Sequence, residues 1–175
     1  MRRMYSLEQL KGIISEVLGI DITKENPVKI YDGSFNSSEY PSITLTASYI
    51  KVVRNFNELQ FIFNCRLTNG TESAITLTND TVIATFNVND EEVQNKIYAH
   101  AGTQCSTSSD VSAGSIAYAS LFISETTGTA QTSLMPRYVN LYHVSGSLRF
   151  YLEGGNFSIG ASSSMDLEAR ISLAL

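Results

Sequence analysis

The chain has 175 residues, a length at which a single domain buries a core without disulfide or metal staples. Its composition, 43% apolar and 17% charged with abundant Ser, Thr and Asn, excludes a disordered chain and favours β structure. The formal net charge of −5 excludes a basic field that would attract nucleic acid or an anionic membrane, so we expect neither nucleic-acid binding nor membrane insertion.

The first segment predicts an amphipathic helix over residues 7–18. Ser6 and Gln9 form a capping box, and Gly19 is a C-terminal stop. Steps of three, four and three separate the apolar residues of one stripe, which are Leu7, Leu10, Ile14 and Val17. We expect residues 1–20 to attach or oligomerise the protein. The helix either packs on its own domain or another protein, or it self-associates.

Charged residues interrupt the apolar N-terminal run, which is therefore unlike a secretory signal. We expect synthesis in a cytoplasm and release, if any, by lysis or assembly. Residues 21–42 read as an extended connector to the following domain.

Period-two alternation begins after the connector. Residues 42–54 and 58–67 predict a hairpin whose second strand buries its odd-numbered apolar residues. Residues 81–88 and 116–124 predict further strands, and 95–102 is interpreted as another. The acidic stretch 87–94 is expected to be a loop, as are the small, polar stretches 102–115 and 125–137.

Four short strands complete the chain, over 138–144, 147–153, 156–161 and 165–175. In the last, we expect Leu167, Ile171 and Leu173 in the core or in a subunit interface, and Leu175 at a sheet end near solvent. About nine short strands indicate that residues 43–175 form an antiparallel β-sandwich of the jelly-roll type, preceded by the N-terminal helix.

Catalytic and metal-binding motifs are sparse, so we expect no enzyme and no cofactor. Asp166 and Glu168 share one strand face and could bind Ca²⁺, but they lack an accompanying Asp-rich loop. One histidine near Cys105 and another at His143 are too few for a zinc site. Cys65 reads as a buried apolar residue, although a bridge to Cys105 stays open. Four N-x-S/T sequons are interpreted as turn chemistry, at Asn36, Asn69, Asn79 and Asn156.

Aromatic residues are the remaining candidates for a contact surface. The chain has nine Tyr and eight Phe, and tyrosines near strand ends can stack on a sugar or on a partner protein. We select Tyr138 and Tyr142 as possible ligand or partner contacts. A carbohydrate-binding β-sandwich module is therefore the alternative function.

The run "YIKVVRNFNELQFIFNCRLTNG", followed by "TVIATFNV" and later by "SGSLRFYLEGGNFSIGAS", resembles the C-terminal heads of bacteriophage fibre and baseplate proteins. The resemblance covers roughly residues 43–175. It implies a trimeric jelly-roll head on a virion protein, either a head or tail fibre, a spike, or a capsid decoration protein. The implied partners are two further copies of the chain, other virion proteins and a host-surface glycan, and the implied location is the particle surface. No site residue follows from it.

Overall fold

The computed structural model describes residues 6, 28–55, 58–100, 114–127, 137–144 and 147–174, and gives the backbone alone at 98–100, 114, 125–127 and 144. The elements in chain order are β1 (Lys29–Phe35), β2 (Ile43–Asn55), β3 (Glu58–Asn69), β4 (Ile75–Leu77), β5 (Val82–Phe86), α2 (Glu91–His100), β6 (Gly114–Thr127), β7 (Arg137–Val144), β8 (Ser147–Glu153), β9 (Phe157–Ile159) and β10 (Ser164–Ala174). The helix expected over residues 7–18 lies outside the described residues.

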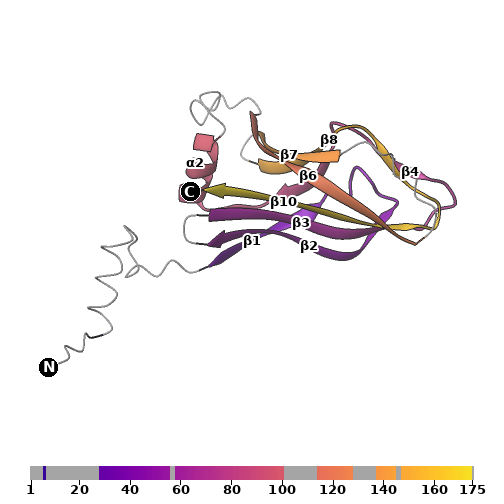
Figure 1. Cartoon of the computed structure of the whole chain (residues 1–175), viewed down its shortest axis with the longest axis horizontal. Helices are drawn as coiled ribbons and strands as arrows, with labels where there is room; N and C mark the ends of the chain where they lie inside the picture. Colours follow the sequence, from indigo (N-terminus) through magenta and orange to yellow (C-terminus); the bar gives the residue numbers. More distant parts are fainter. Residues whose placement is uncertain are drawn as a thin grey trace.

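Eight strands form a closed antiparallel barrel in the order β1-β2-β3-β10-β6-β7-β8-β5, and β5 pairs back to β1. The expected jelly-roll sandwich is therefore wrong, because the two sheets of a jelly roll remain separate and these strands close on one another. The remaining strands, β4 and β9, form a separate two-stranded sheet. Figure 1 shows the long strands β2, β3 and β10 side by side, with β4 beyond one end of the barrel.

Two strands, β1 and β6, close the barrel, because each changes its pairing partner along its length. The first half of β1 pairs with β2, and its second half, residues 33–35, pairs with β5. On the opposite side, β6 pairs with β7 over residues 114–121 and with β10 over 122–127. Gly33 stands at the β1 corner, where a Cβ atom would lie 2.6 Å from Ile50 and 2.8 Å from Phe86, so only glycine fits there.

Strand β1 also corrects the expected domain boundary. Residues 29–35 were assigned to a connector ending at residue 42, yet they pair with two strands of the barrel. Tyr31 and Phe35 are buried, with the small Gly33 between them. This short inward stripe, set among polar residues, is too weak to be recognised as a strand from its sequence. The barrel therefore begins at Lys29.

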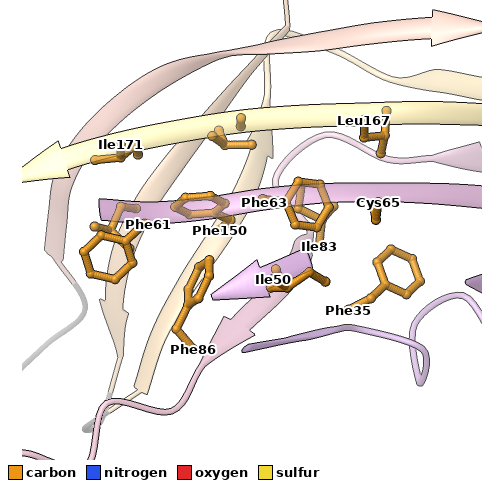
Figure 2. Packing of buried hydrophobic residues seen from close by; sticks show 14 of the residues in the cluster. Phe35, Ile50, Phe61, Phe63, Cys65, Ile83, Phe86, Phe150, Leu167 and Ile171 are labelled. Carbon is orange, nitrogen blue, oxygen red and sulfur yellow. The ribbon is translucent and has the colours of Figure 1, made fainter. Parts of the chain in front are cut away.

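Aromatic side chains fill the barrel interior. Phe61, Phe63, Phe86 and Phe150 are at most 2% exposed. The Phe86 and Phe150 rings meet edge to face with centroids 4.8 Å apart, and Phe61 meets Phe86 in the same way at 5.3 Å. Figure 2 shows these rings gathered between the strands. An eight-stranded barrel is just wide enough for side chains to fill its interior.

The last strand crosses this core between β3 and β6. Leu167, Ile171 and Leu173 are buried, as expected for the core, and their register places Ile171 opposite Phe61. Leu175 lies outside the described residues. The predicted hairpin is confirmed by the antiparallel pairing of β2 with β3, and the pairing of β7 with β8 forms a second hairpin.

Helix α2 stands where a loop over residues 87–94 and a strand over residues 95–102 are predicted from the sequence, so both predictions are wrong. Val93 and Ile97 are fully buried and stand four residues apart, which is the spacing of one helix face. Asp90 caps the helix, since its side chain accepts a hydrogen bond from the Val93 N–H. Ile97 and Ala99 are two residues apart, which is also the spacing of a strand face. The acidic residues of the first turn have the composition of a surface loop. In Figure 1 the helix lies at the end of the barrel opposite β4.

Asparagine side chains organise several turns, as the sequons were interpreted to do. Asn69 is fully buried, and its amide donates to the carbonyls of Ser73, Ile159 and Gly160. Asn36 donates to the Val82 carbonyl. The side chain of Asn79 accepts from the Gly155 N–H, and that of Asn156 accepts from the Asn79 N–H.

Candidate functional site

A groove of about 600 Å³ lies on the outside of the barrel over β2, β3, β10 and β6. The residues that line it are Ala47, Asn64, Arg66, Phe122, Ile123, Ser124, Asp166, Leu167 and Glu168. Most of these side chains occupy the strand positions that alternate with the buried core residues, so the strands of the closed barrel hold them in place.

The floor of the groove follows two adjacent rows of the sheet. In one row Tyr49 stands opposite Asn64, Asn64 opposite Glu168, and Glu168 opposite Phe122. Three strand spacings separate Tyr49 from Phe122, a distance of about 14 Å. The aromatic side chains are 47% and 70% exposed, respectively, so each end of a polar row carries an accessible ring.

The second row contains an ion pair at its centre. Ala47 stands opposite Arg66, Arg66 opposite Asp166, and Asp166 opposite Ser124. The Arg66 Nε donates to Asp166 Oδ1 at 2.8 Å, and Nη2 donates to Oδ2 at 2.9 Å. This bidentate pair fixes two long side chains in one orientation, and the carboxylate raises the pKa of Arg66 above its usual value.

The Ca²⁺ hypothesis for Asp166 and Glu168 is not favoured by this geometry, because both oxygens of Asp166 already accept hydrogen bonds from Arg66. Within the described residues, no group of three or more His, Cys, Asp or Glu is placed to hold a metal ion. Cys65 and His143 are both buried. Burial raises the pKa of the Cys65 thiol to about 12 and lowers the pKa of His143. Cys105 lies outside the described residues.

A second charged cluster lies at the end of the barrel where α2 begins. Asp90 accepts hydrogen bonds from the Lys29 ammonium at 2.8 Å and the Tyr31 hydroxyl at 3.1 Å, and Arg54 lies 3.8 Å away. The hydrogen bond from Lys29 first, and then those from the Val93 N–H and the Tyr31 hydroxyl, hold the pKa of Asp90 at about 2. The cluster ties the helix cap to β1 and β2, and we interpret it as structural.

Tyr138 and Tyr142 both lie on β7, on the outside of the barrel. Tyr138 is 38% exposed, whereas Tyr142 is half-buried with its ring 5.2 Å from that of Tyr151. Tyr118, 60% exposed on β6, stands opposite Asn140, which in turn stands opposite Tyr151. These four tyrosines form an outward aromatic face over β6, β7 and β8, here called the tyrosine face.

Asn140 is the polar centre of the tyrosine face. It is only 3% exposed although it points away from the interior. Its amide donates to Glu153 Oε1 at 2.8 Å and accepts from the Ser115 hydroxyl at 2.7 Å. The surrounding side chains thus form a packed, hydrogen-bonded outer layer.

The exposed aromatic residues Tyr49, Tyr118 and Phe122 were missed as candidates from the sequence. The alternation of side chains along a strand could have identified Phe122. Its neighbours Leu121 and Ile123 face inward, so Phe122 must face outward. The expected attachment residues Leu7, Leu10, Ile14 and Val17 lie outside the described residues. No helix in the described part of the chain is long and apolar enough to cross a membrane.

Comparison with known proteins adds no relative: no family model, no curated protein and no solved structure matches the chain.

Proposed function

We propose that the chain is a non-enzymatic structural protein of a phage virion, displayed on the particle surface, whose barrel is a binding domain. The observation that carries the proposal is the contrast between a filled interior and an outer surface with exposed aromatic side chains. Phe61, Phe63 and Phe150 are 0% exposed, whereas Phe122 and Tyr118 are 70% and 60% exposed. Contact with a partner would bury these rings.

The virion assignment is supported by the sequence resemblance to phage fibre and baseplate heads, which covers every strand of the barrel except β1. The proposed location is a head or tail fibre, a spike, or a decoration on the capsid, with other virion proteins as partners. Mass spectrometry of purified virions from the source phage tests it. The protein should be present in a fixed ratio to the major capsid protein, and its absence from washed particles would refute the assignment.

The proposed assembly is a homotrimer in which the tyrosine face contacts a neighbouring copy. Tyrosine is enriched in protein interfaces because its ring buries a large area at low entropic cost. Size-exclusion chromatography with light scattering should give three times the chain mass. A monomer at high protein concentration would refute the trimer.

A double variant separates the tyrosine face from other exposed apolar positions. Tyr118→Ala with Tyr138→Ala should weaken the trimer, because both rings lie on the proposed contact. Val28→Ala with Ile30→Ala is the matched control, since both of these side chains are 58% exposed near the start of β1. If the trimer persists in the tyrosine double variant and dissociates in the Val28→Ala, Ile30→Ala control, the contact does not lie on the tyrosine face.

A further inference from the structure

We propose that the groove over β2, β3, β10 and β6 is an oligosaccharide-binding site, with Phe122 in its lining and Tyr49, next to Asn64 at the other end of the same row, as stacking platforms. The inference rests on the proposed function as a binding domain and specifies the chemical class of its receptor. The expected ligand is a neutral oligosaccharide of several rings. A single sugar ring could not touch both aromatic side chains across three strand spacings.

The distribution of polar groups distinguishes a sugar from a protein partner. Protein interfaces place apolar side chains at the centre and polar ones at the rim. The groove has the reverse arrangement, with Asn64 and Glu168 between two exposed aromatic rings and the Arg66–Asp166 pair in the adjacent row. A sugar chain matches this order, because its hydroxyl groups can bond to a polar floor while its apolar ring faces stack on aromatic side chains.

The floor also presents the appropriate hydrogen-bonding groups. Asn64 offers both donors and an acceptor, and Glu168 offers two acceptor oxygens. Both side chains are exposed at the centre of their row. The Arg66–Asp166 pair, 43% and 37% exposed, is already held in a fixed orientation, so little side-chain entropy would be lost when a hydroxyl group binds to it.

The charge of the groove indicates which sugars it accepts. The positive charge of Arg66 and the negative charge of Asp166 are paired, which leaves Glu168 as the unpaired charge among the lining side chains. A polyanionic glycan would approach this carboxylate unfavourably, whereas a neutral one would use it as a hydrogen-bond acceptor. We therefore expect neutral oligosaccharides to bind better than sulfated or uronic-acid polymers.

The first experiment applies the full-length protein to a printed array of neutral and acidic oligosaccharides, followed by calorimetric titration with the strongest soluble binder. The wild type should bind at least one neutral oligosaccharide. Tyr49→Ala and Phe122→Ala should each raise its Kd about tenfold, the loss expected for one stacking contact. Phe122→Trp should retain binding, because it keeps an aromatic platform at the same position.

Ile30→Ala is the matched control, since Ile30 is an exposed apolar side chain on the outside of β1, away from the groove. It should bind as the wild type does. Unchanged circular dichroism of each variant would exclude misfolding as the cause of lost binding. No binding to any neutral glycan on the array, or binding that persists in both alanine variants, would overturn the inference.

Three further outcomes separate this inference from the alternatives. If Phe122→Ala dissociates the oligomer and no glycan binds, the groove is a protein contact and the inference fails. If the protein is present in virions but binds no glycan, the glycan inference fails and the virion assignment stands. Glycan binding by a protein absent from virions would overturn only the virion assignment.

Discussion

Replacement of Phe150 by alanine tests whether the barrel is packed through its centre. The Phe150 side chain is 0% exposed and lies within 6.5 Å, centroid to centroid, of the rings of Phe61, Phe63 and Phe86. Truncating a buried phenylalanine to alanine lowers the free energy of unfolding by about 3–5 kcal/mol, because the transfer free energy of the ring is lost and a cavity remains. Loss of the edge-to-face contacts places the expected value near the upper end, at about 5 kcal/mol.

Phe122→Ala is the matched control, because the same residue type is removed from a position that is 70% exposed. Its free energy of unfolding should change by no more than about 0.5 kcal/mol. Equilibrium urea unfolding, followed by circular dichroism at one fixed protein concentration, measures both variants against the wild type. A loss below about 1.5 kcal/mol for Phe150→Ala would show that the interior is loosely filled and would refute the packing argument.

Two other predictions concern the last strand and the helix cap. Ile171→Asp should prevent folding or cost more than about 4 kcal/mol, because the charge would replace a side chain buried opposite Phe61, whereas Ser172→Asp on the exposed side should fold normally. A soluble, folded Ile171→Asp protein of unchanged stability would contradict this. Asp90→Asn should cost about 1 kcal/mol at pH 7, since the Lys29 interaction with Asp90 is partly exposed to solvent. Because the folded-state pKa of Asp90 is depressed to about 2, the stabilisation is present above pH 4 and is lost as the pH falls towards 2. Urea unfolding at several pH values should show the wild type and the variant converging in acid, and a constant difference would contradict the assignment.

The individual strands could be predicted from the sequence where alternation was clean. In β3 and β10 every second residue is buried, and the register pairs Leu59 with Leu173 and Phe63 with Ala169. A single buried face produces such a pattern whichever strands are its neighbours. The strands were therefore predictable, but their closure into a barrel was not.

Closure depends on two strands that change partners, and local sequence does not specify either change. Phe35 pairs with Ala84 across 49 residues, and Phe122 pairs with Glu168 across 46. Bulges at Thr46 and Ile116, one in β2 and one in β6, shift the parity within a strand and blur the alternation there. A jelly roll and a closed barrel thus share the same pattern of short amphipathic strands.

The candidate groove was harder to predict than the fold, because its residues come from four strands. Asn64 and Glu168 are ordinary outward polar residues in their own strands, and only the register places them between Tyr49 and Phe122. The exposed face of Asp166 was recognised from the alternation. Its pairing with Arg66, 100 residues earlier in the chain, was not.

The most direct test of a binding groove on the outside of a filled barrel is a nuclear magnetic resonance titration of the ¹⁵N-labelled protein with the glycan selected on the array. The account predicts amide shift changes concentrated at Tyr49, Asn64, Phe122 and Glu168, with the amides of β5 and β8 unchanged. Shift changes concentrated in β5 and β8, with the four groove positions silent, would contradict it.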